Sequence, residues 1–134
     1  MDINPVDLAD VTAANDAFYR AFEAADMDAM SDVWEHSDRV TCGHPGWAVL
    51  RGWAEVSASW MTLFSGGLPL QFILTDAHVA VAGDAAWVTV NENILSARSG
   101  STVSAINVFV RARSGWTMVA HHGSGVVDTM TGRD

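Results

Sequence analysis

The sequence predicts a single α+β domain in which three N-terminal helices pack on one face of an antiparallel sheet. Apolar residues recur at helical spacing through the first half of the chain, and they alternate in runs separated by short turns through the second half. Helices followed by consecutive strands are typical of this architecture. The 134 residues contain no linker or internal repeat. We therefore expect one domain over residues 1–134, with its core at about 7–124.

The first helix is predicted to begin near Asn4, whose side chain can cap it before Pro5 takes the first helical position. Asp7 suits the first turn because a carboxylate there faces the positive end of the helix dipole. Apolar side chains then recur at helical spacing at Leu8, Val11, Phe18, Phe22 and Ala25.

Two further helices and a short strand complete the first half. We expect a short helix over residues 28–34 and a strand at residues 39–42, which the Pro- and Gly-containing segment 43–47 ends. A third helix is predicted over residues 52–64, ended by the Ser-Gly-Gly segment 65–67 and by Pro69. Its apolar stripe consists of Trp53, Val56, Trp60 and Phe64.

The second half is predicted to form an antiparallel meander of four strands. Leu70, Phe72 and Leu74 alternate in the first strand, and Val79 and Val81 continue it after an irregularity. The next three strands are expected at residues 85–95, 102–113 and 116–122. Turns at Gly83–Asp84, Ser99–Gly100 and Ser114–Gly115 join them.

The composition limits the partners and the location of the protein. The net charge is −9 with only seven Lys and Arg residues, so neither nucleic acid nor an anionic membrane is an expected partner. The chain has no 18-residue apolar run and no signal-peptide pattern, so a cytoplasmic location without a membrane span is expected. The single cysteine, Cys42, excludes an intrachain disulfide and a four-cysteine zinc site.

Five segments carry a resemblance to a known family: Ala25-Asp26-Met27-Asp28, His44-Pro45-Gly46, Gly52 with Trp60, residues 105–109 and residues 116–124. With the order of elements, they resemble the nuclear transport factor 2-like superfamily, and best its SnoaL-like group of polyketide-cyclase and ketosteroid-isomerase relatives. The resemblance implies a curved sheet, a conical apolar pocket between helices and sheet, and a homodimer through the convex side. It leaves the chemistry open, because the superfamily contains isomerases, cyclases, dehydratases, epoxide hydrolases and non-enzymatic binders.

The ketosteroid isomerases use an aspartate base, with a tyrosine and a protonated aspartic acid as the oxyanion hole. Matching the motifs places Phe18 at the tyrosine position and Asn107 at the acid position. The base position falls on Cys42 by counting from Asp26, or on His44 if the residue before the proline is matched. Phe18 cannot donate a hydrogen bond and Asn107 cannot shuttle a proton. The standard isomerase reaction is therefore not expected.

Two histidines are candidate catalytic residues. His44 lies beside a Pro-Gly turn, where a loop can aim its ring into a pocket as a base; the alternative is a loop histidine bonded to backbone. By strand alternation His122 shares a face with Trp116 and Met118 and would enter the pocket, whereas His121 would point to the convex face or a dimer contact. The alternative for His122 is a core histidine whose nitrogens are satisfied by neighbours.

Glu92 is the third candidate catalytic residue. It shares a strand face with Val88, Val90 and Ile94, where a carboxylate would have a raised pKa or a partner. An inward Glu92 would form an acid–base dyad with His122. The alternative is a residue at a strand end or bulge that faces water.

Seven more residues are predicted to contact a ligand: Phe18, Cys42, Trp47, Trp53, Trp60, Asn107 and Met118. The Asn107 amide can bond a ligand carbonyl, Trp60 matches a pocket aromatic of the isomerases, and Trp47 and Trp53 would flank the mouth of the pocket. The alternative for each aromatic is a core position. No metal and no cofactor are expected, because the chain has neither H-E-x-x-H spacing nor a Gly-rich phosphate loop.

Three functions are compatible with these features. The first is a pocket that binds a small, largely apolar molecule, with acid–base chemistry of the isomerase, cyclase or dehydratase type by His44, Glu92 and His122. The second is a non-catalytic binding or accessory protein, and the third is an oligomerisation module. An enzyme predicts at least two of these groups in one closed pocket, a binder at most one, and a partner module a filled cone with a large apolar face.

Overall fold

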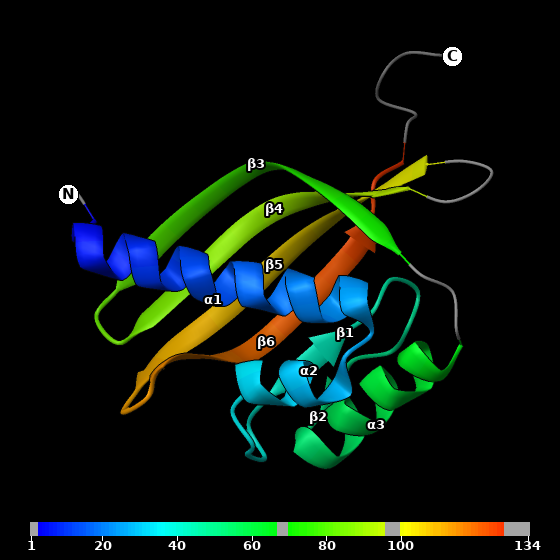
Figure 1. The fold of residues 1–134 in the computed structure, drawn as a ribbon, viewed down its shortest axis with the longest axis horizontal. Helices are drawn as coiled ribbons and strands as arrows, with labels where there is room; N and C mark the ends of the chain where they lie inside the picture. The colour runs from blue at the N-terminus through cyan, green and yellow to red at the C-terminus, as the bar shows by residue number, and fades with distance from the viewer. Residues whose placement is uncertain (1–2, 67–69, 96–99, 128–134) are drawn as a thin grey trace.

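The computed structural model describes residues 3–66, 70–95 and 100–127. Within them the chain forms helices α1 (Pro5–Ala24), α2 (Met27–Val33) and α3 (Trp53–Ser65), and strands β1 (Thr41–Gly43), β2 (Leu50–Arg51), β3 (Gln71–Ala82), β4 (Ala85–Leu95), β5 (Gly100–Ala112) and β6 (Gly115–Gly125). α1 crosses the concave side of the curved sheet, and α2 and α3 lie beside its β1–β2 end (Figure 1). The predicted α+β architecture is confirmed.

Local capping positions the first two helices. The side chain of Asn4 accepts a hydrogen bond from the backbone N–H of Val6, as expected for the start of α1. Ala25, in the left-handed conformation with φ 52°, ends α1, and the Asp26 side chain caps α2 at the N–H of Ala29. The second helix therefore begins one residue before the predicted start at residue 28.

The sheet has the strand order β2-β1-β6-β5-β4-β3. The predicted antiparallel meander of β3 to β6 is confirmed. The short strand β1 lies parallel to β6, so that Cys42 pairs with His121 and Gly43 with His122. Of the predicted stops and turns, Gly67, Pro69 and Ser99 lie outside the described residues.

Irregularities in two strands decide which side chains face inward. In β3 the register shifts between Thr75 and His78, at the predicted irregularity, and Asp76 has φ 57°. Between β5 and β6, Val108 pairs with Ala120, and the next residue of β5, Phe109, pairs with Met118. Val119 of β6 is therefore an extra residue without a partner in the register. Such a bulge inverts the alternation of the residues that follow it.

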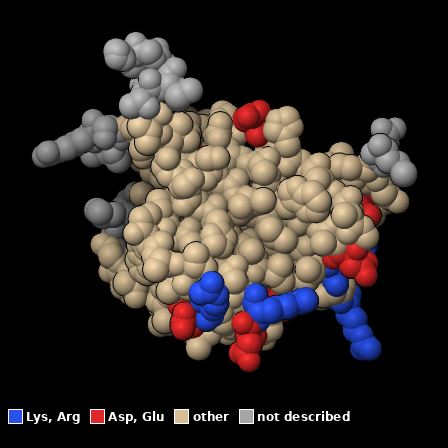
Figure 2. All heavy atoms as spheres, turned by 180° about the vertical axis from the view of Figure 1, so that it is seen from behind, with Lys and Arg blue, Asp and Glu red and all other residues tan. Residues whose placement is uncertain are grey.

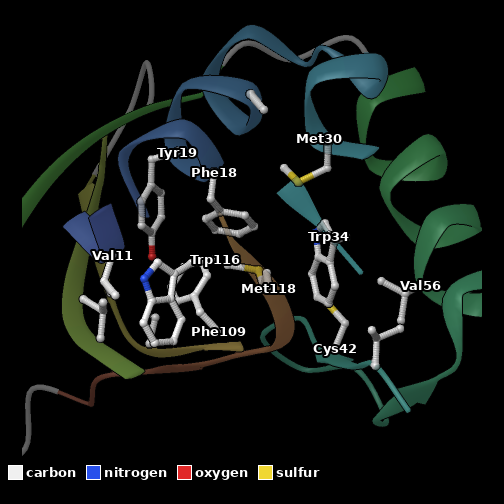
Figure 3. Close-up of a cluster of buried hydrophobic side chains, with 14 of the residues drawn as sticks. Val11, Phe18, Tyr19, Met30, Trp34, Cys42, Val56, Phe109, Trp116 and Met118 are labelled. Atoms are coloured by element: carbon white, nitrogen blue, oxygen red, sulfur yellow. The ribbon is translucent and has the colours of Figure 1, made fainter. Parts of the chain in front are cut away.

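The core fills the space between the helices and the concave side of the sheet. Figure 3 shows Phe18 and Tyr19 descending from α1 toward Phe109 and Trp116 of the sheet, with Met30, Trp34, Cys42 and Val56 forming the other half of the cluster. The aromatic rings of Phe18 and Trp60 meet edge to face at 5.6 Å. The C-terminal ends of α1 and α3 lie at one side of this core, near Glu92 and Ile94 of β4 and His121 of β6.

The outer face of the sheet is nearly free of charge. Seen from behind, charged side chains gather along the lower margin of the molecule, and the sheet surface carries almost none (Figure 2). Large apolar side chains are exposed there, among them Trp87 (38%) and Ile106 (37%). Among the described residues, no helix is long and apolar enough to cross a membrane. The cytoplasmic location stays a prediction.

Candidate active site

A cavity of about 630 Å³ lies between the C-terminal ends of α1 and α3, the loop after β1, and strands β4 and β6. Its apolar lining comes mainly from Phe22, Trp47, Leu63, Phe64, Leu70 and Ile94. Four ionisable side chains also line it: Glu23, His44, Glu92 and His121. An apolar cavity with a few polar groups of this kind is typical of a small-molecule site.

Glu92 faces inward, as the strand alternation predicted, and only 3% of it is exposed. The hydroxyl of Tyr19 donates a hydrogen bond to its Oε2 at 2.5 Å. Burial raises the pKa of Glu92 to about 7, and the bond from Tyr19 partly opposes this shift. Burial and the neighbouring Glu92 raise the pKa of Tyr19 far above its usual value, so the phenol keeps its proton.

His121 lines the cavity and is held in place by Asn107, which lies behind the cavity wall. The amide nitrogen of Asn107 donates to Oδ1 of Asn15 at 2.9 Å and to the hydroxyl of Tyr19 at 3.1 Å. Its Oδ1 is therefore the acceptor for Nδ1 of His121 at 2.6 Å, and this assignment puts the imidazole proton on Nδ1. Burial, together with the charges of His44 and His122, lowers the pKa of His121 to about 3. The ring is neutral at pH 7 and keeps a lone pair on Nε2.

These bonds form one directed chain from His121 through Asn107 and Tyr19 to Glu92. Each member donates to the next, so the donor direction runs toward the carboxylate along the whole chain. Both end groups line the cavity. Two ionisable groups of the cavity are thus coupled through a buried amide and a buried phenol.

His44 also enters the cavity, from the loop after β1. Its Nε2 lies 2.9 Å from Oγ of Ser59, and Ser59 donates its own proton to the carbonyl of Val56 at 2.7 Å. His44 is therefore the donor in the first bond, and its Nδ1 keeps a lone pair. Burial lowers the pKa of His44 to about 4. The alternative reading was a histidine whose ring bonds to the backbone; the ring of His44 instead bonds to the side chain of Ser59.

The predicted roles of the two adjacent histidines are exchanged. The bulge at Val119 turns His121 onto the face of Trp116 and Met118, whereas His122 lies on the opposite face with its Nε2 at 3.3 Å from Oγ1 of Thr41. The expectations that His122 enters the pocket and that His121 lies at the surface were wrong. The expected Glu92–His122 dyad is not formed, because His122 lies on the opposite face of the sheet; Glu92 bonds Tyr19 instead.

Trp47 lines the cavity and stands at its mouth with 43% of its surface exposed, as expected. The other predicted contact residues do not line it. Five of them are buried behind the wall: Phe18, Cys42, Trp60, Asn107 and Met118. Burial raises the pKa of Cys42 to about 12, so the thiol stays protonated at pH 7 and cannot act as a base.

Trp53 was expected beside Trp47 at the mouth of the pocket, and this expectation was wrong. Trp53 is the first residue of α3, whereas the cavity is lined by Leu63 and Phe64 near the end of that helix. Ten helical residues span roughly 15 Å, which places Trp53 far from the cavity. Its ring stacks on His36 at 4.4 Å.

Three residues of the site were missed from the sequence: Asn15, Tyr19 and Ser59. Asn15 and Tyr19 lie four residues apart on the buried side of α1, next to Val11 and Phe18. Polar side chains on an apolar helix stripe are the signal that could have found them, because buried polar groups need partners. The motif match placed the tyrosine position at Phe18, one residue before the side chain that carries the hydroxyl.

The family of this chain follows from its similarity to known proteins. A model of the SnoaL-like domain matches residues 11–129. The chain belongs to the SnoaL-like family. A solved structure from Streptomyces avermitilis, provisionally described as a dehydratase of the NTF2-like family, is 42% identical to this SnoaL-like chain. That match covers 91% of this chain and 97% of the other, with a TM-score of 0.85.

Two further proteins are similar to this SnoaL-like chain. A protein from Thiobacillus denitrificans, provisionally described as a calcium/calmodulin-dependent protein kinase type II association domain, is 36% identical, with 87% of this chain and 94% of that chain covered and a TM-score of 0.80. F-box protein SKIP8 of Arabidopsis thaliana is 28% identical over 114 residues, which are 85% of this chain and 48% of that protein. The chain thus spans about half the length of this curated relative.

Proposed function

We propose that this SnoaL-like protein catalyses proton transfer on a small, largely apolar molecule in the cavity, with Glu92 as the acid–base group. The observation that carries the proposal is the hydrogen-bonded chain from His121 to Glu92, whose two ends line the same cavity. A chain of buried, mutually satisfied polar groups holds both end groups in one orientation. Such positioning is what general acid–base catalysis requires.

The protonation state of Glu92 suits this role. With a pKa of about 7, the carboxyl group exists in both forms at neutral pH. Its ionised form can accept a proton from a carbon next to a carbonyl group, and its protonated form can return that proton. Tyr19 holds Oε2, which leaves Oε1 for the substrate.

Among reactions of this type we favour the elimination of water from a β-hydroxy carbonyl compound. The solved structure described as a dehydratase is 42% identical to this chain, which supports this choice. In the proposed step the proton on the α-carbon passes to Glu92 and leaves an enolate. The carbon–carbon double bond then forms as the carbon–oxygen bond of the β-carbon breaks, and the hydroxyl group leaves as water with the proton from Glu92. The neutral rings of His44 and His121 position the substrate.

The test uses an apolar β-hydroxy ketone, 4-hydroxy-4-(2-naphthyl)butan-2-one, in D₂O at pH 7. Exchange of the α-protons is followed by NMR, and the enone is followed by its absorbance. We expect both reactions with the wild type and a loss of about 100-fold or more in E92Q. H122A is the matched control, because its ring lies on the outer face, and it should keep the activity. Absence of both reactions, or equal rates in E92Q, would overturn the proposal.

A second candidate function, self-association through the outer sheet face, is favoured by a separate observation. That face carries almost no charge although the chain has a net charge of −9, so two copies can meet there without direct repulsion (Figure 2). The exposed Trp87 and Ile106 supply apolar contacts. The relative described as an association domain supports the same reading.

Light scattering tests the association. We expect a mass of twice 14.3 kDa for the wild type and a monomer for I106E, which places a charge on the outer face. V6E is the control, because Val6 is also exposed (65%, against 37% for Ile106) but lies on α1. A monomeric wild type, or dimerisation that V6E weakens as much as I106E does, would exclude this homodimer.

A further inference from the structure

The polar side chains of the cavity are set up to accept hydrogen bonds. His121 gives its Nδ1 proton to Asn107, so Nε2 can only accept. His44 gives its Nε2 proton to Ser59, so Nδ1 can only accept. Two carboxyl groups, Glu23 and Glu92, add further acceptor oxygens. Each histidine is thus fixed in one tautomer by a partner outside the cavity.

Donors are scarce in the same lining. None of its described residues is Lys or Arg, and the indole of Trp47 stands at the half-open mouth. In the interior, the carboxyl group of Glu92 is the side chain that can donate, and only in its protonated form. An anionic ligand would therefore meet two carboxyl groups and two neutral imidazoles without a compensating cation. Burying an unpaired charge in such surroundings is strongly unfavourable.

We infer that the cavity takes ring compounds that present a hydroxyl hydrogen-bond donor and carry no negative charge, and that it rejects carboxylates and phosphates of the same size. The inference rests on the proposed function only in placing the ligand in this cavity. The aromatic walls formed by Phe22, Trp47 and Phe64 suit a flat ring system. A volume of about 630 Å³ accommodates two or three fused rings.

Binding of three naphthalenes that differ in one group tests the inference by calorimetry at pH 7.5. 2-Naphthol is neutral and donates a hydrogen bond, 2-methoxynaphthalene is neutral and cannot donate, and 2-naphthoate is an anion. We expect 2-naphthol to bind at least tenfold more tightly than the ether and at least fiftyfold more tightly than the carboxylate. Equal binding of the ether, or tighter binding of 2-naphthoate, would overturn the inference.

Two carboxyl-to-amide substitutions identify the cause of the discrimination. E23Q and E92Q keep the size of each side chain, and each amide oxygen can still accept the native bond from the N–H of Phe72 or from Tyr19. In the double variant we expect the preference for 2-naphthol over 2-naphthoate to fall at least fivefold. D10N removes an exposed carboxylate of α1 outside the cavity and should leave the preference unchanged. An unchanged preference in the double variant would contradict the inference.

The inference and the proposed function fail in different ways. Selective binding of 2-naphthol without proton exchange in the hydroxy ketone would overturn the proposed function and leave the ligand class intact. Proton exchange that depends on Glu92, with equal binding of 2-naphthol and 2-naphthoate, would overturn the ligand class alone.

Discussion

The hydroxyl group of Tyr19 and the carboxyl group of Glu92 form a buried hydrogen bond of 2.5 Å that joins α1 to β4 across 73 positions of the sequence. Both groups would be costly to bury alone, and each satisfies the other. Asn107 donates to the same hydroxyl, which ties the pair to His121 on β6. This small network is therefore at once a contact between helix and sheet and the frame of the candidate active site.

Removing the Tyr19 hydroxyl should change both the stability and the carboxyl titration. In Y19F we expect the free energy of unfolding to fall by about 1–2 kcal/mol, because a buried bond to a carboxyl group is lost. The pKa of Glu92 should rise above that of the wild type, since the bond from Tyr19 lowers it. Urea unfolding and NMR titration of the Glu92 carboxyl carbon measure the two effects. In the E92Q variant, Y19F should lower the free energy of unfolding by less than it does in the wild type. Equal losses in the two proteins would argue against an interaction between Tyr19 and Glu92.

The stability of the wild type should depend on pH through Glu92. Its pKa is raised from 4.5 to about 7 in the folded state, so the folded state binds the proton more tightly than the unfolded chain. The contribution is fully present below pH 4.5 and is lost as the pH rises through 7, about 3 kcal/mol in total. The E92Q variant should not show this loss of stability with rising pH.

The comparison of E92Q with the wild type isolates this effect. The lowered pKa values of His44 and His121 act in the opposite sense, because their contribution is lost as the pH falls below 6.5. Both histidines are present in the two proteins, so their contribution cancels in the difference. Urea unfolding from pH 4.5 to 8 measures the difference in the free energy of unfolding between the wild type and E92Q. A difference that does not change with pH would disprove the raised pKa of Glu92.

The two adjacent histidines should respond very differently to substitution by alanine. H121A leaves the carbonyl oxygen of Asn107 without its partner and opens a hole beside Phe18, so we expect a loss of about 2–4 kcal/mol. H122A removes a partly exposed ring from the outer face and should cost less than about 1 kcal/mol. Chemical denaturation measures both. Similar losses in the two variants would contradict the bulge at Val119.

Gly43 lies so close to His122 that a side chain does not fit between the strands. A Cβ atom at position 43 would stand 2.7 Å from Nδ1 of His122. We expect G43A to cost about 1–3 kcal/mol, and most of this loss should be recovered in G43A/H122A. The control is G125A, where a Cβ atom would have no neighbour within 4 Å. Thermal unfolding compares the wild type, H122A and these three variants, and a cost of G43A that H122A does not relieve would refute this contact.

Much of the fold was readable from local patterns. The cap at Asn4, the first helix and the four long strands follow from residue spacing and turn chemistry, and the structure confirms them. The inward orientation of Glu92 followed from regular alternation, because β4 pairs with β5 without a break. The hydrogen-bond partner of Glu92 could not be predicted in this way, because Tyr19 is 73 residues away and lies on a helix.

The sequence by itself determined the fold class and the order of elements, because these depend on periodicity within single segments. It also offered His44, from its Pro-Gly turn, and Glu92, from strand alternation, as candidates for the cavity. The tertiary structure decided which of the adjacent histidines enters the cavity. One extra residue, Val119, is accommodated only when β6 pairs with β5, and it exchanges the faces of His121 and His122. The pairing of distant strands and a helix likewise decided that Asn107 and Tyr19 connect His121 to Glu92, since no local pattern records a hydrogen bond between segments far apart in the chain.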